Sequence, residues 1–159
     1  MFIVSHFCIS VILANSINCY SVAKRGIPVV SGKEVLLVGI FGLLPDILNP
    51  HLFLSDRLES WTHTLWFIFG IIAILLAAML LGMIRNNWLS LLLVMGVGLH
   101  ILCDAITGGV KLLWPIDDIY GSYLIGSPHW IMLDLLFGSM ALVSWVCFRF
   151  IGWRNLTSR

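Results

Sequence analysis

Residues 88–106 read WLSLLLVMGVGLHILCDAI, an apolar stretch interrupted near its end by His100 and Asp104. A helix that crosses a bilayer needs about 20 mostly apolar residues, and this stretch meets that length. The two polar residues are four positions apart, so a helix places both side chains on one face, about one turn from each other. Because ionisable side chains cost free energy inside a bilayer, the stretch predicts a functional site as well as a membrane span.

The composition of the whole chain supports a membrane protein. Of its 159 residues, 60% are hydrophobic and only 11% are charged, which excludes an ordinary soluble domain and disorder. We predict one all-α domain over 1–159, a compact bundle of about five transmembrane helices at 2–20, 34–48, 61–84, 88–106 and 129–151. The second is short because Pro45 disfavours helix in its neighbourhood, so that segment either spans with tilt or enters the membrane and returns.

The distribution of basic residues predicts the orientation. In a five-span topology, seven of the nine basic residues fall on one side: Lys24, Arg25, Lys33, Arg85, Arg149, Arg154 and Arg159. The positive-inside rule then places the N-terminus outside and the C-terminus in the cytoplasm. The first apolar run lacks a basic leader and a clear cleavage site, which predicts a retained helix. The four cysteines form no C-x-x-C pair and predict no disulfide, and a net charge of +1 gives no reason to expect nucleic acid.

This topology brings polar side chains to the outer ends of the helices. All five histidines and three aspartates fall there: His6, Asp46, His51, His63, His100, Asp104, His129 and Asp134. Nitrogen and oxygen ligands without cysteine suit zinc, manganese or iron. We therefore predict one metal site, or a two-metal site, with the ligands His6, Asp46, His63, His100 and Asp104. The alternatives are a polar contact between helices for His100 and Asp104, and a cap or salt bridge for Asp46. Thr62 fits a helix N-cap.

Five short blocks of the sequence resemble a known family, the LexA-regulated, membrane-bound metal-dependent hydrolases. They are Ser5-His6, Leu43-Leu44-Pro45-Asp46-Ile47, Thr62-His63-Thr64-Leu65, Leu99-His100-Ile101-Leu102-Cys103-Asp104, and Thr107-Gly108-Gly109 with Leu112-Leu113-Trp114-Pro115. The resemblance covers about two thirds of the chain, from His6 to about Pro115. It implies an enzyme of the inner (cytoplasmic) membrane that holds a divalent metal ion, zinc first, with manganese or iron as alternatives.

The resemblance and the predicted topology together suggest a reaction. We expect hydrolysis of a membrane lipid or lipid-linked substrate, a phosphoester first, by metal-activated water at the periplasmic face. Asp134 is the expected catalytic base or a group that orients a ligand histidine, and Glu59 is a further catalytic candidate. The expected substrate-binding residues are Arg57, Thr107, Lys111 and His129.

The chain also departs from the family pattern in two places. Where the family usually continues the Pro-Asp block with an acid and a histidine, this chain has Leu48 and Asn49. Where it usually has His-Arg-Gly before Thr-His, this chain has Leu58, Glu59 and Ser60. Because of these departures, an alternative hypothesis is that the chain is a catalytically degenerate member of the family. Two other functions stay open as well, an ion-binding or transport protein and a structural protein whose polar cluster joins helices.

Overall fold

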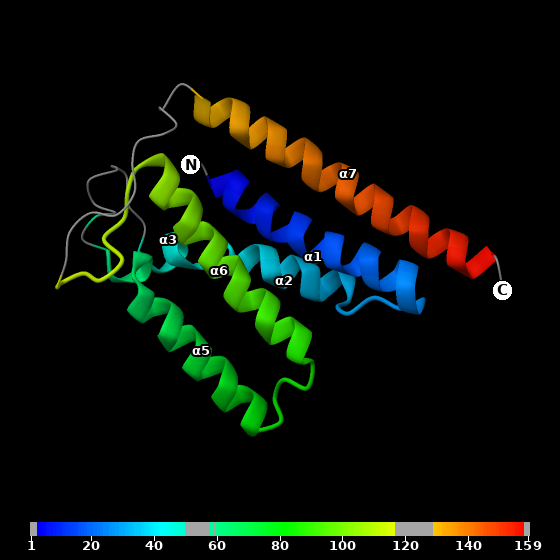
Figure 1. Ribbon diagram of the computed structural model, residues 1–159, viewed down its shortest axis with the longest axis horizontal. Helices are drawn as coiled ribbons and strands as arrows, with labels where there is room; N and C mark the ends of the chain where they lie inside the picture. Colours follow the sequence, from blue (N-terminus) through cyan, green and yellow to red (C-terminus); the bar gives the residue numbers. More distant parts are fainter. Residues whose placement is uncertain (1–2, 50–57, 59, 117–128, 158–159) are drawn as a thin grey trace.

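The fold is an all-α bundle, seen in a computed structural model that describes residues 3–49, 58, 60–116 and 129–157 (Figure 1). The elements in chain order are α1 (Ile3–Arg25), α2 (Gly32–Phe41), α3 (Leu44–Leu48), the 3-10 helix η1 (Trp61–His63), α5 (Leu65–Leu80), α6 (Asn87–Thr107) and α7 (Trp130–Thr157). In the described ranges, three helices are long and apolar enough to cross a membrane: Val4–Arg25, Asn87–Thr107 and Ile131–Ile151. The predicted class, an all-α membrane bundle, is confirmed.

The second and third predicted helices differ most from expectation. The segment 34–48 is broken at Gly42 and Leu43, so α2 has 10 residues and α3 has 5. At 1.5 Å per residue, α2 is about 15 Å long, roughly half of the hydrocarbon core. The third helix, expected from residue 61, begins at Leu65 because Thr64 is its N-cap and accepts from the Phe67 amide. The expected N-cap role of Thr62 is therefore wrong.

Asn18 holds the loop that follows α1. Because of this, a helix as short as α2 can bring the chain back to the end of the bundle at which α1 begins. The Asn18 side chain is fully buried and makes three backbone hydrogen bonds, to Val29 N (3.0 Å), Val30 N (3.1 Å) and Val30 O (2.9 Å). These bonds draw the loop after Arg25 back along α1, by about 10 Å at the helical rise. From that level, α2 needs only its ten residues to approach the depth of His6.

The elements alternate in direction, and α7 runs parallel to α1. Asn15 donates to Ser144 Oγ at 3.1 Å, and Ser5 contacts Asp134; both pairs are 129 residues apart. This constant offset means that the two helices run side by side in the same sense (Figure 1). No residue of the span Ile131–Ile151 on α7 is buried, as expected of a helix that packs by one face and turns the other to lipid.

Glycines let α1, α2 and α6 approach closely near the site. A side chain at Gly42 would overlap Ser10 Oγ and lie 2.8 Å from the His6 carbonyl, and one at Gly96 would lie 3.1 Å from Val38 O. Small residues at helix crossings are typical of membrane bundles, where association depends on close packing rather than on the hydrophobic effect. This contact fixes the end of α2, and with it Asp46, against α6.

Candidate metal centre

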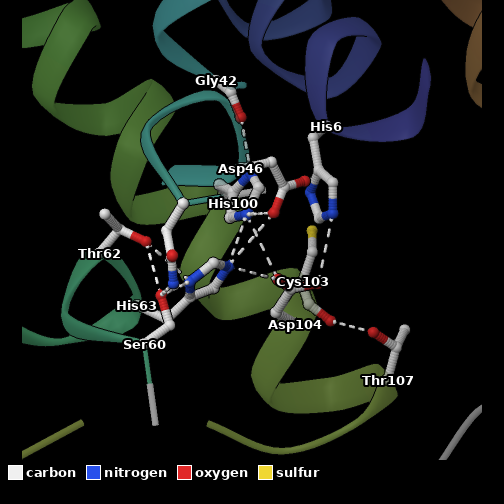
Figure 2. Close-up of polar contacts among 11 residues, drawn as sticks. His6, Gly42, Asp46, Ser60, Thr62, His63, His100, Cys103, Asp104 and Thr107 are labelled. Carbon is white, nitrogen blue, oxygen red and sulfur yellow. Dashed lines mark hydrogen bonds and ion pairs between the residues drawn. The ribbon is translucent and has the colours of Figure 1, made fainter. Parts of the chain in front are cut away.

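Five polar side chains from four elements converge at one end of the bundle (Figure 2). His6 comes from α1, Asp46 from α3 and His63 from η1, while His100 and Asp104 come from α6. Four of them are at most 2% exposed: His6, His63, His100 and Asp104. The structure thus brings together all five residues that the sequence singled out as metal ligands.

Four donor atoms of this cluster surround a common centre. The Nε2 atoms of His63 and His100 lie 3.2 Å apart. Asp46 Oδ1 is 3.4 Å from each of them, and Asp104 Oδ2 is 3.2 Å from His63 Nε2 and 3.3 Å from His100 Nε2. Zinc bonds to nitrogen and oxygen of about 2.0–2.1 Å place neighbouring ligands of a tetrahedron roughly 3.3 Å apart. The five separations therefore match those between neighbouring ligands of one ion, and all four atoms lie within 4.8 Å of one another.

The charges of this set also suit a divalent cation. Two carboxylates and neutral imidazoles carry two negative charges, and burying such charges without compensation is costly. A divalent ion neutralises them and accepts all four lone pairs at once. The residues present therefore fit a metal ion by donor type, spacing and charge.

Each ligand histidine is oriented through its other ring nitrogen. His100 Nδ1 lies 2.7 Å from the carbonyl oxygen of Gly42, which can only accept a hydrogen bond. Nδ1 therefore carries the proton, and Nε2 presents its lone pair to the centre. His63 Nδ1 lies 3.1 Å from the hydroxyls of both Ser60 and Thr62, which are buried beside it.

Asp104 links His6 to His63 and His100. Its Oδ2 faces His63 and His100, while its Oδ1 lies 3.3 Å from His6 Nε2. His6 is outside the four-atom set, and its ring stacks on that of His100 with centroids 3.9 Å apart. The position of His6 suits a group that orients the Asp104 carboxylate, or a ligand to a second ion beside it.

Asp46 lies on the open side of the cluster, where its residues are most exposed. Its side chain is 18% exposed, whereas those of His63, His100 and Asp104 are at most 1% exposed. Water or a substrate group would therefore reach the centre past Asp46.

The other predicted site residues are outside the four-atom set, or outside the described residues. Asp134 Oδ1 accepts from the backbone amide of Ser5 (3.0 Å) and from the Ser5 hydroxyl. Thr107 is buried and donates to the Cys103 carbonyl at 2.9 Å, Lys111 is half-buried and His129 is exposed. Three residues lie outside the described part of the chain: His51, Arg57 and Glu59.

Sequence reasoning missed the residues behind the ligands. Asn49 and Ser60, two departures from the family pattern, are in contact: Asn49 Nδ2 donates to Ser60 Oγ at 2.6 Å. Ser60 Oγ is in turn 2.8 Å from Thr62 Oγ1. A run of hydroxyls just before a candidate ligand histidine was the only sequence signal for this network. The role of Gly42 depends on the break between α2 and α3, which Pro45 indicates in the sequence without showing that the Gly42 carbonyl meets His100.

Together, the fold and this cluster define an integral membrane protein with a buried His/Asp centre at the ends of its helices. The sequence matches the profile of the YdjM inner membrane protein family over residues 1–157, so the chain belongs to that family. No curated protein and no solved structure matches the chain. An inner-membrane protein is thus established, and the orientation predicted from the basic residues stays a prediction.

Proposed function

We propose that this protein is a metal-dependent hydrolase of the inner membrane that acts on a lipid or lipid-linked phosphoester. The observation that carries the proposal is the ligand-like spacing of His63 Nε2, His100 Nε2, Asp46 Oδ1 and Asp104 Oδ2, at 3.2–3.4 Å for five of their pairs. The resemblance to metal-dependent hydrolases supplies the reaction class, and the location of the centre at the helix ends favours a substrate held in the membrane.

When bound, a divalent ion of this kind lowers the pKa of a coordinated water toward neutrality and polarises a phosphoryl oxygen. The chain's own residues provide the setting. Gly42, Ser60 and Thr62 hold the two imidazoles with Nε2 turned inward. Asp46, the partly exposed ligand, is the carboxylate best placed to yield a position to water. His6, buried against Asp104, is placed to take up a proton near the centre.

Asp134 has a different role in this proposal from the catalytic one predicted from the sequence. Because its carboxylate accepts from the first turn of α1, we assign it to positioning the helix that carries His6. Lys111 remains a candidate for holding an anionic head group, since it follows α6 at the same end of the bundle.

A second candidate, a purely structural metal centre, is favoured by the number of protein ligands. Structural zinc sites are closed by four protein ligands, whereas catalytic sites usually keep a position for water. In that case the ion would tie α3, η1 and α6 together without chemistry.

Metal analysis tests the proposal first. The protein is purified in mild detergent without chelator, and its metal content is measured by mass spectrometry beside His100→Ala and Asp104→Ala. The matched controls are His129→Ala and Asp134→Ala, which remove the same residue types outside the four-atom set. Near-stoichiometric metal in the native protein and the controls, lost in both site variants, is the expected result. Absence of metal after reconstitution with zinc, manganese and iron would overturn the proposal.

Hydrolysis separates the two candidates. Phospholipids and lipid-linked phosphates are incubated with native and chelator-treated protein, and the released phosphate or head group is measured. Release that returns when metal is restored, and that His100→Ala lacks, supports the hydrolase. The structural metal centre would be supported instead if the protein binds metal tightly, shows no hydrolysis and loses much of its thermal stability on chelation.

A further inference from the structure

An apolar groove lies beside the metal centre, on the side of α5. It has a volume of about 420 Å³ and is lined by side chains from α3, η1, α5 and the segment that follows α6. Protein sites for small ligands are commonly roughly 300–1,000 Å³, so this hollow is large enough to be one. The groove is distinct from the His/Asp cluster, whose ligands do not line it.

Apart from one hydroxyl and the indole N–H groups of its three tryptophans, the described lining of the groove is apolar. Among the lining residues that the structure describes, Thr64 is the only one with a hydroxyl, and that hydroxyl donates to Trp61 O at 2.7 Å and accepts from the Phe67 amide. The rest are large apolar or aromatic side chains, together with Gly70 and Pro115. With its one hydroxyl already engaged, the groove suits a hydrocarbon chain.

The depth of the groove matches one leaflet of a bilayer. On α5 it extends from Thr64 to Ile74, which is about 15 Å at 1.5 Å per residue. Half of a hydrocarbon core of about 30 Å is also about 15 Å. Trp61 and Trp114 lie at the site end, where tryptophans mark the interface with the head groups. A chain lying in the groove would therefore have its head group at the level of the metal centre.

The elements α3 and η1 contribute residues both to the groove and to the centre. Trp61 and Thr64 line the groove, and His63, between them in sequence, belongs to the four-atom set. Leu48 lines the groove two residues after the ligand Asp46 on α3. A lipid whose chain occupies the groove would thus place its head group beside Asp46, the open side of the centre.

Gly70 makes the middle of the groove. A Cβ built there meets nothing within 4 Å, so the groove is open over this turn of α5. Glycine inside a helix costs about 1 kcal/mol relative to alanine, and packing between helices does not require it at this position. The open space over this helical turn is what an occupant of the groove would fill.

From these observations we infer that the groove along α5 binds one acyl chain of a membrane phospholipid and presents its phosphodiester to the metal centre. The presentation of the phosphodiester rests on the proposed function, whereas the binding of the acyl chain does not.

Photo-crosslinking tests the inference. The protein is reconstituted in vesicles of phosphatidylethanolamine and phosphatidylglycerol with a trace of phosphatidylethanolamine that carries a diazirine on one acyl chain, and labelled peptides are mapped by mass spectrometry. The exposed span Ile131–Ile151 of α7 reports contact with bulk lipid. The expected result is labelling of peptides 61–74 clearly above that of α7, which unlabelled phospholipid reduces.

Gly70→Phe fills the groove and should remove this excess. Gly138→Phe on α7 is the matched control, because a side chain there also meets nothing within 4 Å. Equal labelling of 61–74 and α7 in the native protein would overturn the inference, and this arm needs no variant to fold. Unchanged labelling in a folded Gly70→Phe would overturn it as well. Labelling by a diazirine fatty acid but not by the phospholipid would overturn the choice of occupant.

Metal content, measured on the same samples, separates this inference from the proposed function. Gly70→Phe should keep its metal and lose the labelling, whereas His100→Ala should lose its metal and keep the labelling. A groove that labels normally in a protein that binds no metal would refute only the hydrolase.

Discussion

His100 Nδ1 lies 2.7 Å from the carbonyl oxygen of Gly42, the residue that ends α2. This contact joins two helices far apart in sequence and decides which nitrogen of His100 faces the centre. Because the carbonyl cannot donate, the imidazole holds its proton on Nδ1 and keeps Nε2 free to bind. The orientation of His100 thus depends on where α2 stops.

Gly42→Ala tests this dependence. The added methyl group would overlap Ser10 Oγ and lie 2.8 Å from the His6 carbonyl, so α2 must move away from α1. We expect a loss of about 1–3 kcal/mol in stability, as for other overpacked sites, together with weaker metal binding. Thermal melting and metal titration measure both. Gly98→Ala, where a side chain meets nothing within 4 Å, is the control and should be harmless.

Ser60→Ala and Thr62→Val test the support of His63. Both hydroxyls lie 3.1 Å from His63 Nδ1, so removing them together leaves that nitrogen without its two hydroxyl contacts. Loss of such supporting groups typically lowers metal affinity about 10–100-fold. Competition with a metallochromic chelator measures the affinity. Ser139→Ala, on an exposed part of α7, should leave the affinity unchanged. Native affinity in the double variant would show that these two hydroxyls do not support metal binding by His63.

Asn18→Leu should destabilise the protein without affecting the metal. It would leave Val29 N, Val30 N and Val30 O without their side-chain partner, and each buried unsatisfied group costs about 1–3 kcal/mol. Asn18 is twelve residues from His6 on α1, about 18 Å along the helix. We expect a lower melting temperature with metal stoichiometry preserved in the folded fraction. Ser16→Leu, at an exposed position on the same helix, should melt like the native protein.

Asp134→Ala distinguishes positioning of α1 from a role at the metal. Its carboxylate accepts from the Ser5 amide in the first turn of α1, as an N-cap side chain does. Losing such a cap costs about 0.5–2 kcal/mol, and Asp134→Asn, which retains an acceptor oxygen, should recover part of that loss. Both variants should keep their metal. If Asp134→Ala loses the metal while its fold is intact, the positioning role is wrong.

The class of protein and the five side chains that converge in the structure can both be predicted from the sequence. Apolar runs of sufficient length predict spans because each helix satisfies its own backbone, and this property is local. Ionisable side chains near bilayer depth cost free energy. This cost indicates candidate ligands in the sequence itself: His6, Asp46, His63, His100 and Asp104. The i, i+4 spacing of His100 and Asp104 even placed two of them on one face.

How these residues meet depends on contacts between distant parts of the chain. Asn18 captures the loop after α1, glycines allow α2 to lie against α1 and α6, and the break at Gly42 turns a carbonyl toward His100. The groove beside Gly70 likewise needs walls from α3, η1, α5 and the segment after α6. Such features depend on distant segments packing together, whereas the periodicity of a sequence reports only on the faces of one helix at a time.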